Sequence, residues 1–196
     1  GWQSLNMFDQ PQVEQFLRDQ ALASDNVDAF VGCAAQGLGQ NDQSVSVAIN
    51  GAGVHRTLRG TYLIACDGAA SGIRKALGVP WVNLGYDQDW LVVDVETKPG
   101  HTLGVATMQV CDPDRIVTYV CTKEPYRRWE FRLNEGETWE QMLEPEAIAG
   151  LLDKWTPRAT YSVRRAAMYQ FHAATADTWR VGRALIAGDA AHQTPP

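Results

Sequence analysis

The stretch Arg183-Ala-Leu-Ile-Ala-Gly-Asp-Ala-Ala-His192, followed by Gln-Thr-Pro-Pro196, is the most informative part of this 196-residue chain. Leu185–Ala187 are apolar and predict a short buried strand, which ends at Gly188-Asp189. Glycine lets the backbone approach a ligand closely, and an aspartate at the carboxyl end of a strand can accept hydrogen bonds from sugar hydroxyls. The pattern predicts a ligand site at the end of a parallel strand, with a tight turn into a helix as the alternative.

A second motif, Cys66-Asp-Gly-Ala-Ala-Ser-Gly-Ile-Arg74, stands much earlier in the chain. It connects a strand expected at residues 61–66, more continuously apolar and so more deeply buried, to a short helix that Ser71 can cap. Asp67 would lie at the carboxyl end of that strand, where α/β folds keep their ligands. Arg74 follows Ser71 by about one helical turn, so both side chains can face one edge of a site. An ordinary cap with a surface arginine is the alternative.

The first part of the chain predicts a helix followed by a hairpin. Asp9-Gln-Pro-Gln12 is typical of a helix start, with Asp9 as N-cap, and apolar residues then follow helical spacing as far as residues 24–26. Residues 44–49 alternate between polar and apolar, Asn50-Gly51 predicts the hairpin turn, and residues 54–59 return.

From Trp81 the pattern changes to an antiparallel sheet that is rich in aromatic residues and arginine. Strands are expected at residues 90–96, 103–110, 115–121, 129–133 and 161–169, with short helices at 138–143 and 145–155. The fold class is therefore α/β, with α+β character in the inserted part. Residues 1–80 would form part of a nucleotide-binding domain, residues 81–178 an inserted substrate-binding sheet, and residues 179–196 the return to the first domain.

The bulk properties are those of an ordinary globular protein. A net charge of −6 argues against a nucleic-acid surface, and no apolar run reaches the roughly 18 residues of a membrane helix. The cysteines Cys33, Cys66, Cys111 and Cys121 form no C-x-x-C pair, so we expect buried, reduced thiols in a cytoplasmic protein and no metal site. The chain starts without methionine and stops within a motif, which suggests an internal piece of a larger protein.

The two motifs, in this order, resemble the class A flavoprotein monooxygenases, the para-hydroxybenzoate hydroxylase-like aromatic hydroxylases. The DG motif of that family is similar to Asp67-Gly68 with Ser71 and Arg74, and its GD motif is similar to Gly188-Asp189 with the following Ala-Ala-His and two prolines. Further stretches resemble 3-(3-hydroxyphenyl)propionate hydroxylases: Asp9-Gln-Pro11, Trp90-Leu-Val-Val-Asp-Val95, Arg128-Trp-Glu-Phe131, Tyr169-Gln-Phe-His172 and Trp179-Arg-Val-Gly-Arg183.

The resemblance implies a partial FAD-binding, Rossmann-like domain that is interrupted by the antiparallel sheet. It implies that Asp189, with Gly188, binds the ribityl chain of FAD, and that Asp67 and Gly68 lie near the pyrophosphate with Ser71 and with Arg74 behind. It also implies that Gln10 touches the flavin, and that Pro195 and Pro196 flank the isoalloxazine next to the substrate. Six aromatic side chains would form the roof over the substrate ring: Trp90, Tyr119, Trp129, Phe131, Tyr169 and Phe171.

The implied reaction is hydroxylation of a phenolic acid such as 3-(3-hydroxyphenyl)propionate. NAD(P)H reduces the flavin, O2 adds to it, and the resulting C4a-hydroperoxide hydroxylates the ring, so that the cofactor carries out the difficult step. The partners would be a small aromatic substrate and O2, with a homo-oligomer left open. A bulkier aromatic or polyketide substrate is the alternative within the superfamily.

The chain departs from the family because it lacks the G-x-G-x-x-G turn that places a pyrophosphate at a helix N-terminus. We therefore expect this chain alone to bind FAD weakly or not at all, and a non-catalytic substrate-binding module is the alternative to an enzyme. Other interpretations find less support, since Asp67, Asp189 and His192 lack a third metal ligand at a known spacing and Ser71 lacks a nucleophile elbow. Tyr169 and His172 could line a substrate pocket or belong to the core. The arginines Arg127, Arg128, Arg164 and Arg165 could meet a substrate carboxylate or be solvated.

Overall fold

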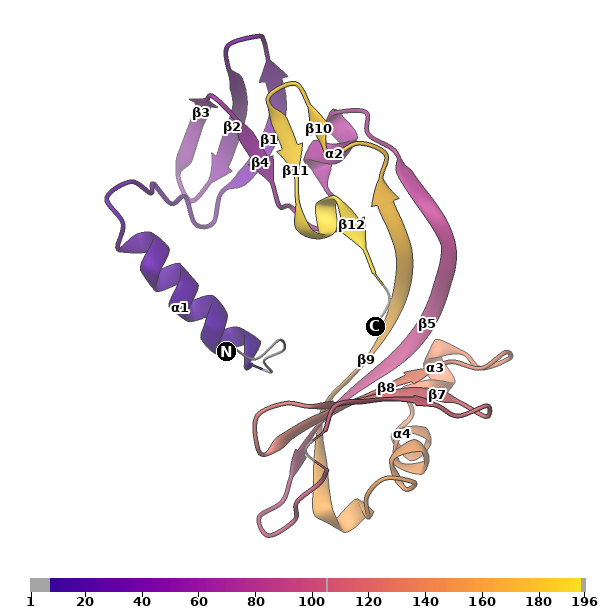
Figure 1. The fold of residues 1–196 in the computed structure, drawn as a ribbon. Coiled ribbons are helices and arrows are strands. Elements are labelled where there is room, and N and C mark those ends of the chain that lie inside the picture. The colour runs from indigo at the N-terminus through magenta and orange to yellow at the C-terminus, as the bar shows by residue number, and fades with distance from the viewer. Residues whose placement is uncertain (1–7, 105, 195–196) are drawn as a thin grey trace, which may run out of the picture. The chain divides into compact units, whose positions relative to one another are not determined.

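The computed structural model describes residues 8–104 and 106–194, and contacts divide the chain into two compact units (Figure 1). Among the described residues, unit 1 contains residues 8–24 and Gln88–Gln170, and unit 2 contains Asp25–Asp87 and residues 171–194. Two long strands, β5 (Trp81–Thr97) and β9 (Tyr161–Ala176), contribute residues to both units. The border between the two units therefore falls inside β5 and inside β9. The domain borders predicted at residues 80 and 178 lie instead just before the start of β5 and just after the end of β9.

Unit 2 contains an antiparallel sheet with the order β1-β2-β3, formed by β1 (Ala34–Gln40), β2 (Val45–Gly51) and β3 (Val54–Gly60). Gly51 pairs with Val54, so the hairpin loop is Ala52-Gly53, with φ of 48° and 77°. Positive φ at both loop residues is typical of a type I′ turn. The prediction of the turn at Asn50-Gly51 is therefore wrong by two positions, because Asn50 still pairs with His55.

A second sheet in unit 2 has the order β10-β11-β4, from β10 (Arg180–Val181), β11 (Ala184–Ile186) and β4 (Leu63–Ala65). Strands β4 and β11 pair in parallel, as the apolar character of the C-terminal stretch predicted. Helix α2 (Gly72–Ala76) follows β4. The core of this part is small: Ala65, Ile73, Val79, Ala176, Ile186, Ala190 and Ala191. The prediction of a deeply buried residue 61–66 strand is wrong for Tyr62 and Ile64, which are 56% and 65% exposed.

The largest sheet has the order β12-β9-β5-β8-β7-β6. Its strands besides β5 and β9 are β6 (Met108–Cys111), β7 (Ile116–Cys121), β8 (Tyr126–Arg132) and β12 (His192–Gln193). The pairs β5–β8, β8–β7 and β7–β6 are antiparallel. The expected 103–110 strand is shorter than predicted. Tyr119 pairs with Met108 in the β6–β7 ladder. Its hydroxyl donates a hydrogen bond to the backbone carbonyl of Gly104 (2.6 Å), so at Gly104 the contact comes from a side chain and not from strand pairing.

One face of this sheet in unit 1 packs against the short helices α3 (Trp139–Met142) and α4 (Pro145–Leu152), which lie beside β7 and β8 (Figure 1). Successive side chains of β5 point to opposite faces of the sheet, so Leu91, Val93 and Val95 lie on the same face. All three are in this core and are 0% exposed. The cluster also contains Tyr119, Trp129, Phe131, Met142, Ile148 and Leu152. The prediction of an aromatic roof over the substrate is therefore wrong for Tyr119, Trp129 and Phe131, because these rings form the core beneath the helices.

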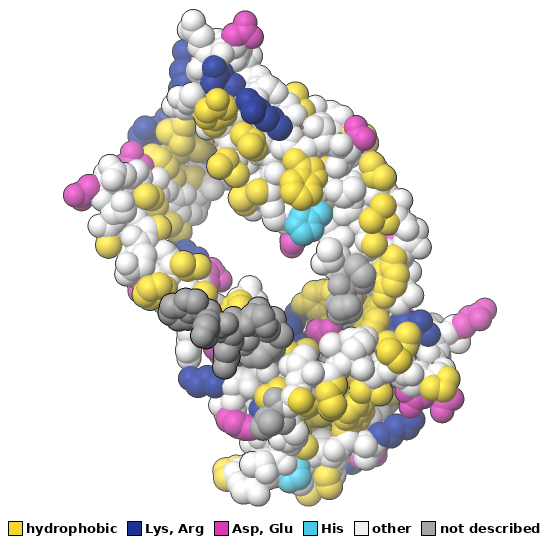
Figure 2. Space-filling view, in the orientation of Figure 1, with side chains coloured by type: hydrophobic (Ala, Val, Ile, Leu, Met, Phe, Trp, Pro, Cys, Tyr) yellow, Lys and Arg dark blue, Asp and Glu magenta, His cyan; other side chains and the backbone are white. Residues whose placement is uncertain are grey.

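Helix α1 (Gln10–Leu22) starts as predicted, since the Asp9 carboxylate accepts a hydrogen bond from the backbone of Gln12 (3.2 Å). None of its residues is buried, and Phe16 and Leu17 are 61% and 60% exposed. Figure 2 shows further hydrophobic side chains at the surface of both units.

The cysteines are free thiols, but the prediction that they are buried is wrong for Cys66 and Cys111, which are exposed. Across residues 8–104 and 106–194, none of the helices combines the length and the apolar character that crossing a lipid bilayer requires.

Strands β1 and β10 are among those of unit 2 that were not predicted from the sequence. The first, β1, has the sequence Ala-Ala-Gln-Gly-Leu-Gly-Gln, which contains no β-branched or aromatic residue and so carries little strand propensity. It becomes a strand by pairing with β2, in an arrangement that includes a bulge between Gln36 and Leu38. The second, β10, has two residues and exists through its pairing with β11.

Candidate functional site

The two motifs that are far apart in the sequence lie at the ends of adjacent strands. Leu63 pairs with Ala184 and Ala65 pairs with Ile186 in the parallel β4–β11 ladder, and the backbone of Ala187 donates to the carbonyl of Ala65 (2.9 Å). The chain continues directly from these ends into Asp67-Gly68 and Gly188-Asp189. The carboxyl ends of adjacent parallel strands form one edge, so the fold brings both motifs together.

The Asp67 carboxylate is held at the start of helix α2. One oxygen accepts a hydrogen bond from the Ser71 hydroxyl (2.6 Å), and the other accepts one from the backbone N–H of Ile73 (3.1 Å). Burial acts to raise the pKa of Asp67, but these hydrogen bonds to the charged form outweigh it, and the pKa lies below its ordinary value. Asp67 is therefore a fixed negative charge that compensates the N-terminus of α2.

Ser71 and Arg74 are internal parts of this turn. Ser71 is 0% exposed, and its hydroxyl oxygen caps α2 by accepting from the backbone of Arg74 (2.9 Å). Arg74 is 5% exposed, donates to the carbonyl of Val79 (3.1 Å) and lies over the Trp81 ring, 4.2 Å from its centroid. The alternative of a surface arginine is wrong, because the guanidinium is buried against the Val79 carbonyl and the Trp81 ring.

The glycines of both motifs leave space beside the backbone. Gly68 and Gly188 have φ of 78° and 59°, and a Cβ added at either position would meet no atom within 4 Å. Asp189 lies in the 3-10 turn η2 (Gly188–Ala190) and is exposed, while Ala190 behind it is fully buried. A carboxylate and two unobstructed glycine backbones therefore face open space at this edge.

His192 is a packing residue in this structure. Its ring stacks on Trp179, with centroids 5.6 Å apart and planes 11° apart, and its backbone pairs with Thr175 in the β12–β9 ladder. Among the described residues, no group of three or more His, Cys, Asp or Glu side chains is placed to hold a metal ion. The predicted substrate residues Pro195 and Pro196 lie outside the described residues.

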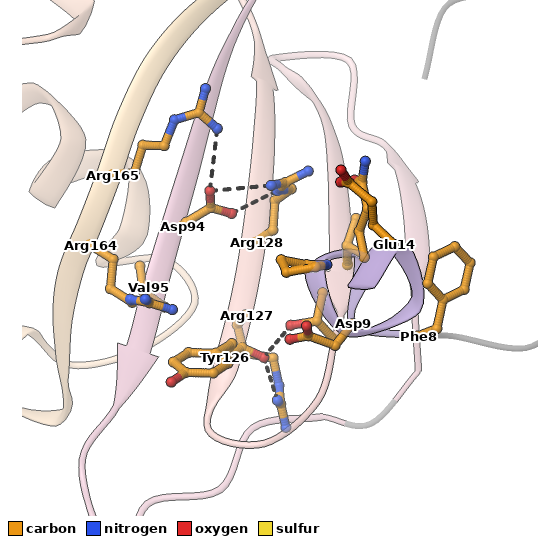
Figure 3. A pocket seen from close by; sticks show the side chains of 14 residues that line it. Phe8, Asp9, Glu14, Asp94, Val95, Tyr126, Arg127, Arg128, Arg164 and Arg165 are labelled. Carbon is orange, nitrogen blue, oxygen red and sulfur yellow. Dashed lines mark hydrogen bonds and ion pairs between the residues drawn. The ribbon is translucent and has the colours of Figure 1, made fainter. Parts of the chain in front are cut away.

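Gln10 lines an open pocket of about 860 Å³ in unit 1 (Figure 3). One side of the pocket is the start of α1, and the other is formed by side chains of the large sheet and by Thr122. The sheet residues are Asp94, Val95, Val120, Tyr126, Arg127, Arg128, Arg164 and Arg165. This pocket brings the predicted flavin-contacting glutamine and the four arginines of the sequence pattern into one place.

Asp94 organises the arginines of this pocket (Figure 3). Its carboxylate accepts from Arg128 Nε (2.7 Å) and from a second Arg128 nitrogen (3.2 Å), and Arg165 lies 3.7 Å away. The hydrogen bond with Asp94 holds the pKa of Arg128 above its ordinary value. Arg165 also donates to the hydroxyl of Tyr169, so this predicted substrate residue takes part in the same cluster. The sequence analysis did not predict Asp94 as a site residue. The signal was there, because Asp94 is the one acidic residue in the otherwise apolar run Leu91–Val95.

His172, the other predicted substrate residue, has its contacts in unit 2. Its Nδ1 bonds to Asp87, whose other oxygen accepts from Asn83 (3.1 Å). The hydrogen bonds with His172 and then with Asn83 lower the pKa of Asp87. Tyr169 and His172 are close in the sequence, yet they belong to different clusters. The sequence analysis did not predict Asp87 as a site residue, because it stands among other polar residues and no local sequence pattern distinguishes it.

The architecture of these units is that of flavin-dependent aromatic hydroxylases. The crystal structure of p-nitrophenol 4-monooxygenase PnpA from Pseudomonas putida DLL-E4 matches with a TM-score of 0.82 at 23% identity, covering 96% of this chain and 49% of that one. Aklavinone-11 hydroxylase in complex with FAD and aklavinone matches with a TM-score of 0.80 at 26% identity, covering 97% of this chain and 37% of that one. The predicted fold class is confirmed.

The chain belongs to the family described as FAD binding domain, which matches residues 1–196. It is 36% identical, over 199 residues, to a 3-(3-hydroxy-phenyl)propionate/3-hydroxycinnamic acid hydroxylase from Comamonas testosteroni, and 34% identical, over 197 residues, to one from Shigella sonnei (strain Ss046). These matches cover 100% of this chain but 33% and 35% of the relatives, so the chain spans about a third of their length. The resemblance to this family, stated from the motifs, is confirmed.

Proposed function

We propose that this chain is the part of an FAD- and NAD(P)H-dependent monooxygenase that holds the flavin edge and part of the substrate pocket, and that the enzyme hydroxylates a phenolic aromatic acid. The observation that carries the proposal is the convergence of Asp67-Gly68 and Gly188-Asp189 at the ends of β4 and β11, in a chain of the FAD binding domain family. The curated relatives named for 3-(3-hydroxy-phenyl)propionate support the substrate class.

The residues at this edge fit a flavin cofactor. The exposed Asp189 carboxylate suits the hydroxyls of a ribityl chain, and the open space beside Gly68 and Gly188 allows close approach of a ligand to the backbone. Asp67 and Ser71 fix the loop that would face the pyrophosphate, and the backbone N–H of Arg74 donates to the Ser71 hydroxyl in the same turn. Gln10, which the family resemblance assigns to the flavin, lines the pocket of unit 1.

A bound flavin supplies hydride acceptance from NAD(P)H and activation of O2. The chain itself supplies positioning, through the carboxylates and glycine backbones at the ends of β4 and β11. We place the enzyme in the cytoplasm, with a small aromatic substrate and O2 as its reactants.

The test uses the full-length gene product that carries this chain. Flavin absorbance is recorded first, then NADH and NADPH oxidation with and without 3-(3-hydroxyphenyl)propionate, and the product is examined by mass spectrometry for one added oxygen. Substrate-stimulated oxidation with a dihydroxylated product is the expected result. A yellow protein that ignores this acid would support the alternative of a bulkier substrate, which the structural match to aklavinone-11 hydroxylase favours. A protein that holds no flavin would contradict the proposal and leave a non-catalytic binding module.

A further inference from the structure

His172 of β9 is oriented by a carboxylate that is itself held in place. Its Nδ1 bonds to Asp87 of β5, and the other oxygen of that carboxylate accepts from the Asn83 amide (3.1 Å). The Asn83 side chain is fixed in turn, because its own oxygen accepts from the backbone N–H of Gly85 (2.7 Å). Both oxygens of Asp87 are therefore occupied, and the imidazole ring has a set orientation.

The charge of Asp87 decides which ring nitrogen of His172 carries the proton. Hydrogen bonds with His172 and then with Asn83 hold the pKa of Asp87 below its ordinary value, so the group is a carboxylate at neutral pH and only accepts hydrogen bonds. Nδ1 must then donate, and Nε2 of the neutral imidazole presents a lone pair. The His172 side chain is 37% exposed, and within the described part of the chain Nε2 has no hydrogen-bond partner. His172 is thus a directed acceptor that is open to a ligand.

The imidazole lies on the side of β9 that faces the GD motif. His172 and Ala176 are four residues apart on β9, so the alternation of a strand puts both side chains on one face. Ala176 packs against Ala190 and Ala191 of the GD motif in the core of unit 2. The open ring nitrogen and the motif assigned to the flavin therefore lie on the same side of the strand.

The β12–β9 ladder brings the chain after the GD motif toward His172 (Figure 1). His192 pairs with Thr175 and Gln193 pairs with Ala174, so β12 runs along β9 in the direction of His172. The distance from Thr175 to His172 is about 10 Å along a strand. The family resemblance assigns the residues that follow this ladder to the substrate, so the ring of His172 lies in the direction of the expected substrate site.

The other polar groups at this edge have different contacts. Asp67 accepts from Ser71 and from the backbone of α2, and the ring of His192 stacks on Trp179. Asp189 is the carboxylate proposed for the ribityl chain. Among these groups, His172 is the one that combines a fixed orientation with an open acceptor atom.

We propose that Nε2 of His172 accepts a hydrogen bond from the hydroxyl of the phenolic substrate, and that His172 thereby selects rings that carry this hydroxyl. Asp87 and Asn83 are positioning residues, because they act through the imidazole. A substrate without the hydroxyl leaves Nε2 facing a group that cannot donate, which is the situation in which a binding site discriminates well. The inference rests on the proposed function for the reaction, and it names the residue that recognises the hydroxyl.

The experiment measures dissociation constants by isothermal titration calorimetry on the full-length protein, without NAD(P)H and at pH 8, where an ordinary histidine is neutral. The first two probes are 3-(3-hydroxyphenyl)propionate and 3-phenylpropionate, which differ in the hydroxyl alone. The wild-type protein should bind the phenol about 3- to 10-fold more tightly, as expected for one hydrogen bond. His172→Phe keeps a planar ring and removes the acceptor, so it should bring the two affinities within about twofold of each other.

A third probe, 3-(3-methoxyphenyl)propionate, has an oxygen that accepts hydrogen bonds but cannot donate one. Asp87→Asn places an amide beside Nδ1 that is able to donate to it, so the imidazole proton can move to Nε2. This variant should therefore bind the methoxy acid better, relative to the phenol, than the wild type does. A purely structural role of Asp87 would weaken all three acids alike.

His55→Phe is the matched control, since it makes the same substitution at an exposed histidine of β3 in the same unit and should leave the preference for the phenol unchanged. Circular dichroism and flavin content establish that each variant folds. The inference is overturned by a wild type without preference for the hydroxyl, by equal weakening of both acids in His172→Phe, or by an equal effect of His55→Phe. If the preference depends on His172 but no phenol is hydroxylated, the proposed function fails and the hydroxyl site stands. Hydroxylation with an unchanged preference in His172→Phe means the reverse.

Discussion

At the scale of single residues, the hydroxyl of Ser71 joins the Asp67 loop to helix α2. It donates to the Asp67 carboxylate and accepts from the backbone of Arg74, and the side chain is fully buried. Loss of an N-cap typically costs about 1 kcal/mol, and a buried unsatisfied partner adds to this. The sequence motif therefore serves the stability of the turn as well as any ligand.

We expect Ser71→Ala to lower the free energy of unfolding by about 1–2 kcal/mol, because the start of α2 loses its cap and Asp67 loses a donor. Urea denaturation of the variant measures this. Ser162→Ala, which changes an exposed serine of β9, is the control and should stay within about 0.5 kcal/mol of the wild type. A variant as stable as the control would show that the buried hydroxyl does not support the turn.

Glu130 is a buried carboxyl on β8 whose pKa lies above its ordinary value. Burial is the main cause, Arg128 opposes it, and the negative charge of Asp94 adds to it. A carboxyl with a raised folded-state pKa costs stability as pH rises from the unfolded-state pKa, about 4.3, through the folded one. The raised pKa of Glu130 thus makes this buried carboxyl a source of destabilisation at neutral pH.

Glu130→Gln should therefore be more stable than the wild type at pH 8, and the difference should shrink to near zero as pH falls to about 4. Denaturation curves recorded across this pH range test the sign. Glu135→Gln, at an exposed position, serves as the comparison and should show no such dependence. A difference that grows toward acid pH would mean that Glu130 is stabilised in its charged form.

At the scale of elements, the β2–β3 hairpin depends on two glycines for different reasons. Gly53 has a φ of 77° and an open position for a Cβ, so its requirement is conformational alone. Gly51 has a φ of 139°, and a Cβ there would lie 2.3 Å from the carbonyl oxygen of Gly32. The segment before β1 thus packs against the backbone of the hairpin, and this approach is possible for glycine only.

We expect Gly53→Ala to cost about 1–2 kcal/mol, from left-handed strain, and Gly51→Ala to cost about 3 kcal/mol or more, because the backbone of residue 32 must move as well. Thermal or urea unfolding of the two variants compares the two costs directly, and each is the control for the other. Equal costs would contradict the close approach of Gly32 to the hairpin.

The elements that the sequence predicted well are those with strong local signals. Helix α1 starts at its Asp9 cap, α2 starts at Ser71, and α3 starts at Thr138 with a capping box. The elements that were missed or displaced depend on partners distant in the chain. Strand β1 exists through pairing with β2, and the hairpin turn falls where the register puts it rather than at Asn50-Gly51.

At the scale of the whole molecule, the proposed flavin edge depends on two segments that the sequence separates by most of unit 1. Asp189 is the exposed carboxylate of this edge, and its backbone follows the β11 strand that pairs with β4. We expect Asp189→Ala in the full-length protein to weaken FAD binding by about tenfold or more through loss of charge-assisted hydrogen bonds.

Equilibrium dialysis or the quenching of FAD fluorescence on titration measures this change. Asp177→Ala removes an exposed carboxylate from the same unit and should leave the FAD affinity as it is in the wild type. Equal loss in both variants would point to a general electrostatic or folding effect. An Asp189→Ala protein with wild-type FAD affinity would remove this residue from the cofactor site.

The sequence by itself determined the two motifs, the caps, the parallel character of the C-terminal strand and the family. These follow from short-range patterns, because a cap, a turn or an apolar run is defined by adjacent residues. It also pointed to the four arginines of the sheet as a group that could meet an acid. It placed three aromatic side chains wrongly over the substrate, because alternation along a strand says that two faces differ but not which of them is covered by helices.

Only the tertiary structure decided which residues act together. The β4–β11 pairing brings Asp67-Gly68 beside Gly188-Asp189, and Arg74 packs over the ring of Trp81. Of the four arginines, Arg128 and Arg165 both contact Asp94. The tertiary structure also assigned Tyr119, Trp129 and Phe131 to the core. The physical reason is that sheet register, burial and the sharing of one carboxylate by two cations depend on distances across the fold, which spacing along the chain does not specify.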